Sequence, residues 1–462
     1  MDHREPALSL RGIRKSFPGV VAVDGVDLDL YPGEIHALVG ENGAGKSTLA
    51  AIAFGELAAD EGSVQADGTV GLVHQHFELI GRLRVWQNVL LGREPHRGWR
   101  IDEAAARARV RALAQDNGLD IDPNAFVETL PVGVQQRVEL LRELDREPAV
   151  LLLDEPTAAL APTEIENFFA TVVQLAARGT AIMIVTHKLA EVMAYAARVT
   201  VMRHGRVVAR MDTAQTDVGA IARAMVGGEL PALAQRVPTI TTPCLAVRLG
   251  PLAFDVNGGE IVGIAGVEGN GQTMLADALT GMIAYDGTIE RRGTIGVIPQ
   301  DRQREALVMN WPLVENVLLG RQHRPAARRG LTLDRARARS DARTIVERFD
   351  IRTASIDVRV RTLSGGNQQK VVVGRALIDE PDFVLAYNPT RGVDVGAAAL
   401  VQSRLIEARN RGSAVLLISF ELDEILALSD RVLVMYRGAI VGSFDHEHLD
   451  RAAIGRLMAG SS

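Results

Sequence analysis

The chain contains the stretch Gly40-Glu41-Asn42-Gly43-Ala44-Gly45-Lys46-Ser47, which fits the pattern G-x-x-x-x-G-K-[ST]. A short apolar run, Glu34 to Val39, precedes it and is typical of a buried strand, and Ser47 to Phe54 is typical of the helix that follows. In this context the glycines let backbone N–H groups face phosphate oxygens, and the helix N-terminus adds positive potential. The stretch therefore predicts a nucleoside triphosphate site, in which Lys46 reaches the β- and γ-phosphates.

A second loop of the same design, with Gln272 in place of the lysine, is Gly266-Val267-Glu268-Gly269-Asn270-Gly271-Gln272-Thr273. Other positions recur at nearly constant offsets, Gln75 with Gln300 and Leu130 with Leu363, so the chain holds two colinear copies of one fold. The stretch from Gly227 to Pro243 contains Gly, Pro and Thr and shows no clear periodicity, which marks a boundary. We predict a first domain over 1–229, a linker over 230–243 and a second domain over 244–462.

The order of apolar segments favours an α/β fold. Val150 to Leu153 and Ala181 to Val185 are continuous apolar runs of strand length, as expected of parallel strands covered on both faces of a sheet. Residues from about 80 to 147 are predicted to be mostly helical and to form a lobe on this core.

Composition excludes several classes of protein. The 462 residues include 47% hydrophobic and 23% charged residues, as in globular domains, and a net charge of −6 argues against a chain built to coat nucleic acid. No apolar run is long enough to span a membrane, and the first residues do not form a secretory signal. The single cysteine, Cys244, excludes an internal disulfide and fits a reducing cytosol.

Two adjacent carboxylates, Asp154 and Glu155, end an apolar strand. One suits a metal and the other an attacking water, so we expect Asp154 to hold Mg²⁺ together with Ser47, and Glu155 to act as general base. The alternative, an exposed acidic pair at a helix start, is disfavoured by the phosphate loop in the same copy.

Three further residues are candidates for the site because they accompany the phosphate loop and the carboxylate pair in the same copy. Gln75 is expected to contact Mg²⁺, and His187, at the end of another strand, to hydrogen-bond the γ-phosphate. Phe17 is expected to stack on adenine, with core packing as its alternative. A metal pair of His74 and His76 is disfavoured because no further ligands accompany them.

The ordered motifs, together with Leu363-Ser364-Gly365-Gly366-Asn367-Gln368, resemble the ATP-binding cassette (ABC) family over almost the whole chain. The resemblance implies two tandem P-loop (RecA-like) nucleotide-binding domains, each with a helical subdomain and a small antiparallel β subdomain, that use ATP and Mg²⁺. It also implies head-to-tail packing, in which the signature loop of one copy clamps nucleotide held by the other. The implied ATP-binding residues are Phe17, Gly40, Glu41, Asn42, Gly43, Ala44, Gly45, Lys46, Ser47, Thr48, Ser364, Gly365, Gly366 and Asp394.

In head-to-tail packing, one nucleotide site combines the second phosphate loop with the signature position of the first copy. All departures from the family pattern fall on this site. The second copy has Gln272 for the lysine, and Tyr387, Asn388 and Phe420 where the first has Asp154, Glu155 and His187. The first copy has Leu130-Pro131-Val132-Gly133 where the second has the signature, and Ala161 where the second has Asp394. The resemblance therefore implies one hydrolytic site and one degenerate site, and leaves open whether the degenerate site binds nucleotide.

Double-cassette chains of this kind resemble ATPase subunits of bacterial importers for simple sugars and for nucleosides. The stretches Leu72 to Phe77, Leu130 to Arg137 and Ser419 to Ile425 look more like the nucleoside branch. The implied partners are two integral-membrane permease subunits and, indirectly, an extracytoplasmic basic-membrane-protein-type lipoprotein, with the chain on the cytoplasmic face of the membrane and no nucleic acid bound.

The permease is expected to dock around Gln75 to Val89 and Gln300 to Val317. Trp86 and Trp311 are candidate contacts there, with core packing as the alternative, and Arg321 to Arg343 is either a lipid-headgroup surface or a solvated helix face. Two rival classes are a double cassette acting on the ribosome or DNA, which is disfavoured by the short linker and broken site, and a non-enzymatic regulator, which the complete first copy opposes.

Overall fold

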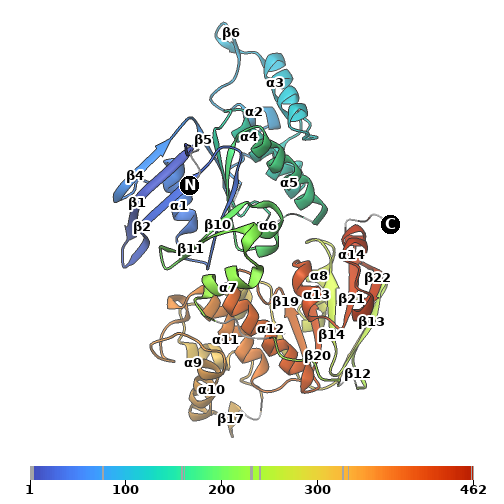
Figure 1. Ribbon diagram of the computed structural model, residues 1–462. Helices are drawn as coiled ribbons and strands as arrows, with labels where there is room; N and C mark the ends of the chain where they lie inside the picture. Colours follow the sequence, from blue (N-terminus) through green and yellow to red (C-terminus); the bar gives the residue numbers. More distant parts are fainter. Residues whose placement is uncertain are drawn as a thin grey trace. The chain divides into compact units, whose positions relative to one another are not determined.

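The computed structural model describes residues 5–74, 77–157, 160, 162–228, 233–238, 241–324, 327–330, 332–458 and 460. The chain divides into two compact units, Met1–Glu229 and Leu230–Ser462 (Figure 1). Within the described part of the chain, no helix is both long and apolar enough to cross a bilayer.

The first unit is built around a six-stranded sheet in the order β11-β10-β3-β9-β8-β5, whose strands are parallel except for β11. Strands β3, β8 and β9 are buried along their whole length, because helices cover the sheet and only apolar side chains fit both faces. This confirms the parallel α/β core expected from the continuous apolar runs. The strands are β3 (Ile35–Gly40), β5 (Val70–Val73), β8 (Val150–Asp154), β9 (Ala181–Thr186), β10 (Arg198–Arg203) and β11 (Arg206–Asp212).

A three-stranded antiparallel sheet, β2-β1-β4, forms the small β subdomain, and a helical lobe lies at another end of the same unit (Figure 1). The lobe carries a short hairpin as well as helices. The small sheet consists of β1 (Leu8–Phe17), β2 (Val20–Leu30) and β4 (Glu61–Ala66), and the hairpin of β6 (His96–Arg97) and β7 (Arg100–Ile101). The helices are α1 (Lys46–Phe54), α2 (Val85–Val89), α3 (Glu103–Asp116), α4 (Val132–Leu144), α5 (Pro162–Ala177), α6 (Leu189–Tyr195) and α7 (Val218–Val226).

The second unit repeats this plan with the sheets β16-β19-β20-β14-β21-β22 and β13-β12-β15 and the hairpin β17-β18. Its strands are β12 (Pro243–Leu249), β13 (Leu252–Asn257), β14 (Ile261–Ala265), β15 (Thr288–Arg291), β16 (Ile295–Ile298), β17 (Arg328–Arg329), β18 (Thr332–Leu333), β19 (Phe383–Tyr387), β20 (Ala414–Ile418), β21 (Arg431–Tyr436) and β22 (Ala439–Asp445). Its helices are α8 (Gln272–Thr280), α9 (Leu313–Leu318), α10 (Arg335–Arg348), α11 (Gly365–Leu377), α12 (Val395–Asn410), α13 (Leu422–Leu428) and α14 (Arg451–Met458).

The topology brings the predicted site residues of each unit to one sheet edge. Strands β3, β9 and β8 are neighbours and run in the same direction, so their carboxyl ends meet. Loops that follow parallel strands at that edge form the ligand crevice in open α/β sheets. The phosphate loop follows β3, the carboxylate pair lies at the end of β8, and His187 follows β9.

Candidate active site

The phosphate loop of the first unit is a tight turn that only glycine can make at two of its positions. Gly43 and Gly45 have φ angles of 82° and 97°, which are strained for residues with a Cβ. A Cβ at Gly45 would lie 2.1 Å from the carbonyl oxygen of Ala22, and one at Gly40 would lie 2.2 Å from that of Met202. The loop therefore packs against two neighbouring strands and leads directly into α1, whose first N–H groups have no partner within the helix.

Lys46 is the first residue of α1 and is 5% exposed. Its ammonium group donates to the carbonyl oxygens of Gly40 at 2.8 Å and Glu41 at 3.0 Å. Burial lowers the pKa of Lys46, while the carboxylates of Glu155, Asp154 and Glu41 act in the opposite direction. A largely desolvated cation within a glycine loop is suited to bind an anionic phosphate, because the attraction is stronger away from bulk water.

Asp154 and Ser47 supply oxygen atoms for a metal ion. Asp154 is 8% exposed at the end of β8, and the Ser47 side chain hydrogen-bonds to its carboxylate. The other carboxylate oxygen, Oδ1, is buried with no hydrogen-bond partner in the protein. Burial raises the pKa of Asp154, and the Ser47 hydrogen bond opposes this. A hydroxyl and an unsatisfied carboxylate oxygen fit Mg²⁺, which prefers oxygen ligands and completes its shell with water and phosphate.

The next residue, Glu155, takes a left-handed backbone conformation with a φ of 45°, and its N–H donates to Val185 at 2.9 Å. Its Oε1 lies 3.0 Å from Nδ1 of His187, so the two predicted catalytic side chains are in direct contact. Burial acts to raise the pKa of Glu155, but the hydrogen bond to His187 and the nearby charges outweigh it, and the pKa is lowered. Glu155 therefore stays ionised near neutral pH and can accept a proton.

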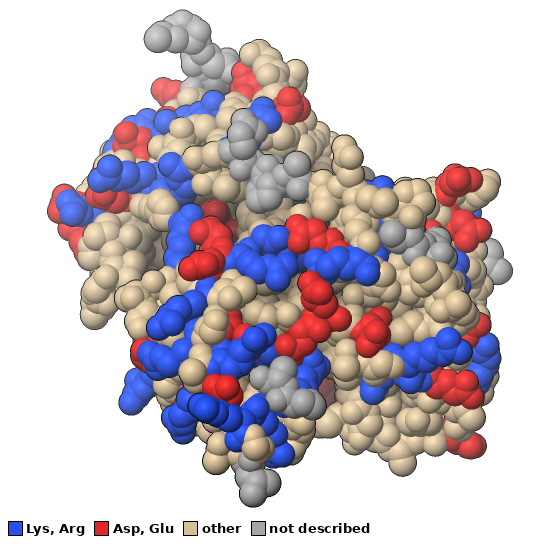
Figure 2. Space-filling view, turned by 90° about the horizontal axis from the view of Figure 1, so that it is seen from below, with Lys and Arg blue, Asp and Glu red and all other residues tan. Residues whose placement is uncertain are grey.

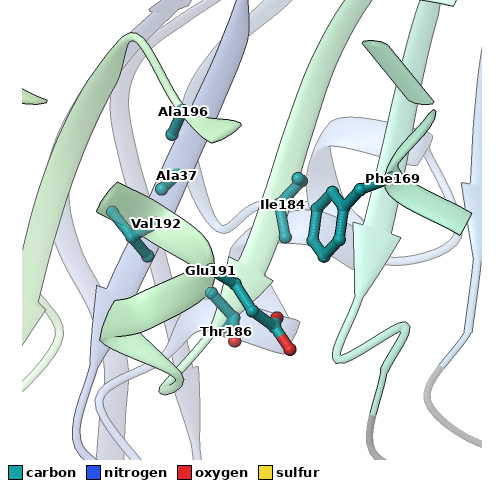
Figure 3. Close-up of a pocket in the computed structure, with 7 residues that line it drawn as sticks. All are labelled: Ala37, Phe169, Ile184, Thr186, Glu191, Val192 and Ala196. Atoms are coloured by element: carbon teal, nitrogen blue, oxygen red, sulfur yellow. The ribbon is translucent and has the colours of Figure 1, made fainter. Parts of the chain in front are cut away.

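A buried threonine–glutamate contact beside this site was missed by the sequence reasoning. Thr157 Oγ1 donates to Glu191 Oε1 at 2.6 Å, and Lys188, which follows His187, donates to the Thr157 carbonyl at 3.1 Å. Figure 3 shows the Glu191 carboxylate beside Thr186 in a small hollow that Phe169 also lines. The contact joins the segment carrying Glu155 to the segment carrying His187.

The second unit has the same threonine–glutamate contact. Thr390 Oγ1 donates to Glu424 Oε1 at 2.8 Å, and both pairs are separated by 34 residues in the chain. The repeated spacing shows that both residues recur in the two copies, but only the structure shows that they are in contact.

Several predicted positions remain predictions. Phe17 is 45% exposed at the end of β1, and Thr48 lies in the first turn of α1. Gln75, His76, Ala161 and part of the predicted linker lie outside the described residues. His74 lies 3.6 Å from Glu78, and within the described ranges no cluster of three or more metal-ligating side chains occurs.

The second unit keeps the backbone of this site and changes its chemistry. Asn388 has a φ of 46° and donates its N–H to Ile418 at 2.7 Å, as Glu155 does to Val185. Its side-chain Oδ1 accepts from the Phe420 N–H at 3.0 Å, so the amide connects the end of β19 to the loop that follows β20. Neither Asn388 nor Phe420 can accept a proton from water.

In the second unit, a phenol stands where the first unit has the carboxylate expected to bind the metal. The hydroxyl groups of Tyr387 and Thr273 lie 3.0 Å apart, where the first unit has a carboxylate and the serine hydroxyl. Gln272 is 1% exposed, and its Nε2 donates to Val267 at 3.1 Å within its own loop. This unit retains the glycine loop and lacks the carboxylate and the lysine.

The predicted signature residues meet at the N-terminus of α11. Ser364 is the N-cap, and its Oγ accepts from the side chain of Asn367 at 3.1 Å. Asp394 caps α12, accepting from Ala397 N–H at 2.7 Å, and its Oδ2 would lie 2.9 Å from a Cβ at Gly366. In the first unit, Pro131 is the N-cap of α4 and has no side-chain capping bond.

Two tryptophans and an arginine-rich stretch were candidate contact surfaces. Trp86 is 3% exposed and belongs to a hydrophobic core cluster, which agrees with the alternative of core packing. Trp311 is 47% exposed. Arg321 is buried and pairs with Asp341 and Asp379, so it belongs to neither expected surface. The exposed Arg337 and Arg339 pair with Asp341 and Asp357, which fits a solvated helix face. Basic and acidic side chains are also interspersed on the face in Figure 2.

The fold and this arrangement define a double P-loop ATPase with a lysine-bearing loop in its first half. The family model described as ABC transporter matches residues 23–158 and 249–391. The chain therefore belongs to the ABC transporter family. As an ATP-binding protein of that family it hydrolyses ATP, with Mg²⁺, to drive transport.

Similar proteins place it among importers. The chain is 39% identical to the guanosine import ATP-binding protein NupO of Bacillus subtilis, over 99% of this chain and 98% of that protein. It is 38% identical to the ribose import ATP-binding protein RbsA 3 of Rubrobacter xylanophilus, over 99% of both chains. The chain is thus the ATP-binding subunit of an ABC importer, which works with membrane permeases and a solute-binding protein.

A similar solved structure is that of an archaeal ribosome recycling factor in complex with a ribosomal stalk protein. It has a TM-score of 0.67 and 18% identity and covers 99% of this chain and 93% of its own. At that identity, it shows a shared fold only.

Proposed function

We propose that the chain energises the import of nucleosides from the cytoplasmic face of the membrane, using one hydrolytic and one degenerate nucleotide site. The observation that supports one hydrolytic and one degenerate site is the difference between the two units at equivalent positions. Glu155 and His187 are in contact at 3.0 Å, whereas the corresponding Asn388 and Phe420 offer no base. Because the proton of the attacking water needs an acceptor, only the first site supports hydrolysis.

Within the hydrolytic site each residue has a distinct role. Lys46 binds the β- and γ-phosphates, and Ser47, Asp154 and Gln75 hold Mg²⁺, which neutralises charge on the phosphates. Glu155 accepts the proton of the attacking water. His187 orients Glu155 through Nδ1, and it donates to the γ-phosphate from Nε2 when the ring carries both protons.

From the head-to-tail packing that the family resemblance implies, we propose that Ser364, Gly365, Gly366 and Asp394 of the second cassette complete this site. Within the second unit, Ser364 is the N-cap of α11 and Asp394 lies beside Gly366, so the residues that the proposal groups together are neighbours. A matched pair of variants tests this assignment. Ser364→Arg should abolish turnover, whereas Pro131→Arg at the equivalent position of the first unit should change it about twofold or less. Equal loss in both variants would contradict the assignment.

The nucleoside assignment rests on the stretches Leu72 to Phe77, Leu130 to Arg137 and Ser419 to Ile425 and on the replaced acids at Tyr387 and Asn388. The 39% identity to a guanosine importer subunit supports it, while the 38% identity to a ribose importer subunit keeps simple sugars as the alternative. We propose two permease subunits and a solute-binding lipoprotein as its partners.

A reconstituted importer tests the substrate. The tagged chain is purified from membranes with its permeases, and ATP turnover is measured with the associated binding protein and either guanosine or ribose. Stimulation by guanosine supports nucleoside import, and stimulation by ribose alone contradicts it. Purification with ribosomes and without permeases would contradict the transport role.

A further inference from the structure

The second unit contains a half-buried arginine, Arg302, that contacts the segment before Asp394 and lies beside the signature loop. Arg302 begins a five-residue π-helical turn, Arg302–Ala306, that follows β16 and Gln300. Its Nη1 donates to the carbonyl of Arg391 at 2.9 Å, and its Nη2 donates to that of Gly392 at 3.5 Å. These carbonyls lie two and three residues before Asp394, so Arg302 holds the segment that leads to this aspartate.

The same guanidinium lies beside the signature loop. A Cβ at Gly365 would lie 2.8 Å from Nη2 of Arg302, closer than real Cβ contacts. Burial lowers the pKa of Arg302, and its Nε is buried without a hydrogen-bond partner. Glycine at this position thus allows the arginine to approach, and the arginine in turn fills the space under the N-terminus of α11.

Two further hydrogen bonds connect the π-helical turn to residues of α11. Gln303 Nε2 donates to Gln368 Oε1 at 3.2 Å, and Arg375 donates to the carbonyl of Ala306 at 2.8 Å. Gln368 in turn donates to the Leu363 carbonyl at 2.9 Å, next to the signature serine. The turn, the start of α11 and the segment before Asp394 are therefore joined into one structure.

The first copy lacks this arginine. With the offset of 225 that relates Gln75 to Gln300, Phe77 occupies the position of Arg302. The first copy also lacks the signature serine and the aspartate. The arginine is thus present only in the copy whose signature loop is intact, which a general packing role in the fold does not explain.

We propose that Arg302 is a positioning residue for ATP hydrolysis. It fixes the signature loop, Ser364–Gly366, relative to the loop of Asp394 and connects both to the segment after Gln300. This inference rests on the proposed completion of the hydrolytic site by the second cassette. Movement of the segment after Gln300 then reaches both loops through one side chain.

Kinetics of the assembled importer test this role with three variants. Arg302→Met keeps an unbranched apolar stem and removes the hydrogen-bond donors and the charge, and Arg302→Lys keeps the positive charge. Arg304→Met is the control, because Arg304 lies in the same turn and is 88% exposed. We expect kcat to fall about tenfold in Arg302→Met and less in Arg302→Lys, with KM for ATP within about twofold of the wild type in both. Arg304→Met should retain the kcat of the wild type.

A kcat for Arg302→Met equal to that of Arg304→Met would overturn the proposal. So would a rise in KM without a fall in kcat, because that is the signature of lost nucleotide binding rather than misplaced loops. If Arg302→Met does not fold, wild-type kcat in Arg302→Lys overturns the proposal. Ser364→Arg, measured in parallel, separates the two hypotheses. Full turnover in Ser364→Arg contradicts the completed site itself, whereas its loss with full turnover in Arg302→Met contradicts only the role of Arg302.

Discussion

The Oε1 atom of Glu155 lies 3.0 Å from Nδ1 of His187, although the two residues are 32 positions apart in the chain. They meet because β8 and β9 are adjacent parallel strands, and each residue follows the carboxyl end of its strand. The contact lowers the pKa of the Glu155 carboxyl and fixes the orientation of its side chain. Substitution of Glu155 therefore tests directly whether this carboxylate is the general base.

Replacing Glu155 with glutamine should lower ATP turnover by about 10²–10⁴-fold, the usual effect of losing a general base. The amide is nearly the same size as the carboxylate, so binding of ATP should persist. Steady-state phosphate release and equilibrium nucleotide binding measure the two effects separately. Glu166→Gln, at an exposed position of α5, is the control and should retain turnover. Full turnover in Glu155→Gln would show that another group accepts the proton.

Gln272→Ala should change turnover by about twofold or less, whereas Lys46→Ala should abolish it. The two side chains start equivalent helices, but only the lysine carries a charge for the transferred phosphate. Phosphate release at saturating ATP compares the two variants directly. A collapse of turnover in Gln272→Ala would mean that the second loop takes part in hydrolysis.

Tyr387→Phe should reduce the free energy of unfolding by about 1 kcal/mol, the usual contribution of one hydrogen bond, because its hydroxyl contacts that of Thr273 at 3.0 Å. Thr273→Val should have a similar effect, and the double variant should lose less than the sum, since both remove the same contact. Urea titrations followed by circular dichroism measure these values. Strict additivity would show that the two hydroxyls do not stabilise one another.

Stability should depend on pH through Glu424. Burial raises the pKa of this carboxyl from 4.5 to about 7, so the folded protein holds its proton more tightly than the unfolded chain. The resulting stabilisation is complete below pH 4.5 and is lost as the pH rises towards 7. Relative to Glu424→Gln, the wild type should therefore lose up to about 3 kcal/mol across this range.

Thermal unfolding at pH 5 and pH 8 measures this difference for the wild type, Glu424→Gln and Glu447→Gln. Glu447 is exposed and serves as the control, so its variant should follow the wild type. A constant difference between wild type and Glu424→Gln at both pH values would mean that Glu424 titrates at its ordinary pKa in the folded protein.

The sequence by itself determined the class of fold and named most residues of the proposed hydrolytic site. The phosphate loop, the Asp154-Glu155 pair and the two copies are local patterns, because a glycine turn between a buried strand and a helix needs particular residues at fixed spacing. Continuous apolar runs were enough to predict parallel strands, since only such strands are covered on both faces.

Only the tertiary structure showed what connects these patterns. The contacts of Thr157 with Glu191, of Arg302 with the Arg391 carbonyl, and of Thr273 with Tyr387 join residues 34, 89 and 114 positions apart. None of these contacts can be read from a local sequence pattern. Each depends on which strand ends the sheet order brings together and on the space that glycines leave free. The sequence thus predicted the groups proposed to carry the chemistry, and the packing of the sheet decided which side chains hold them in place.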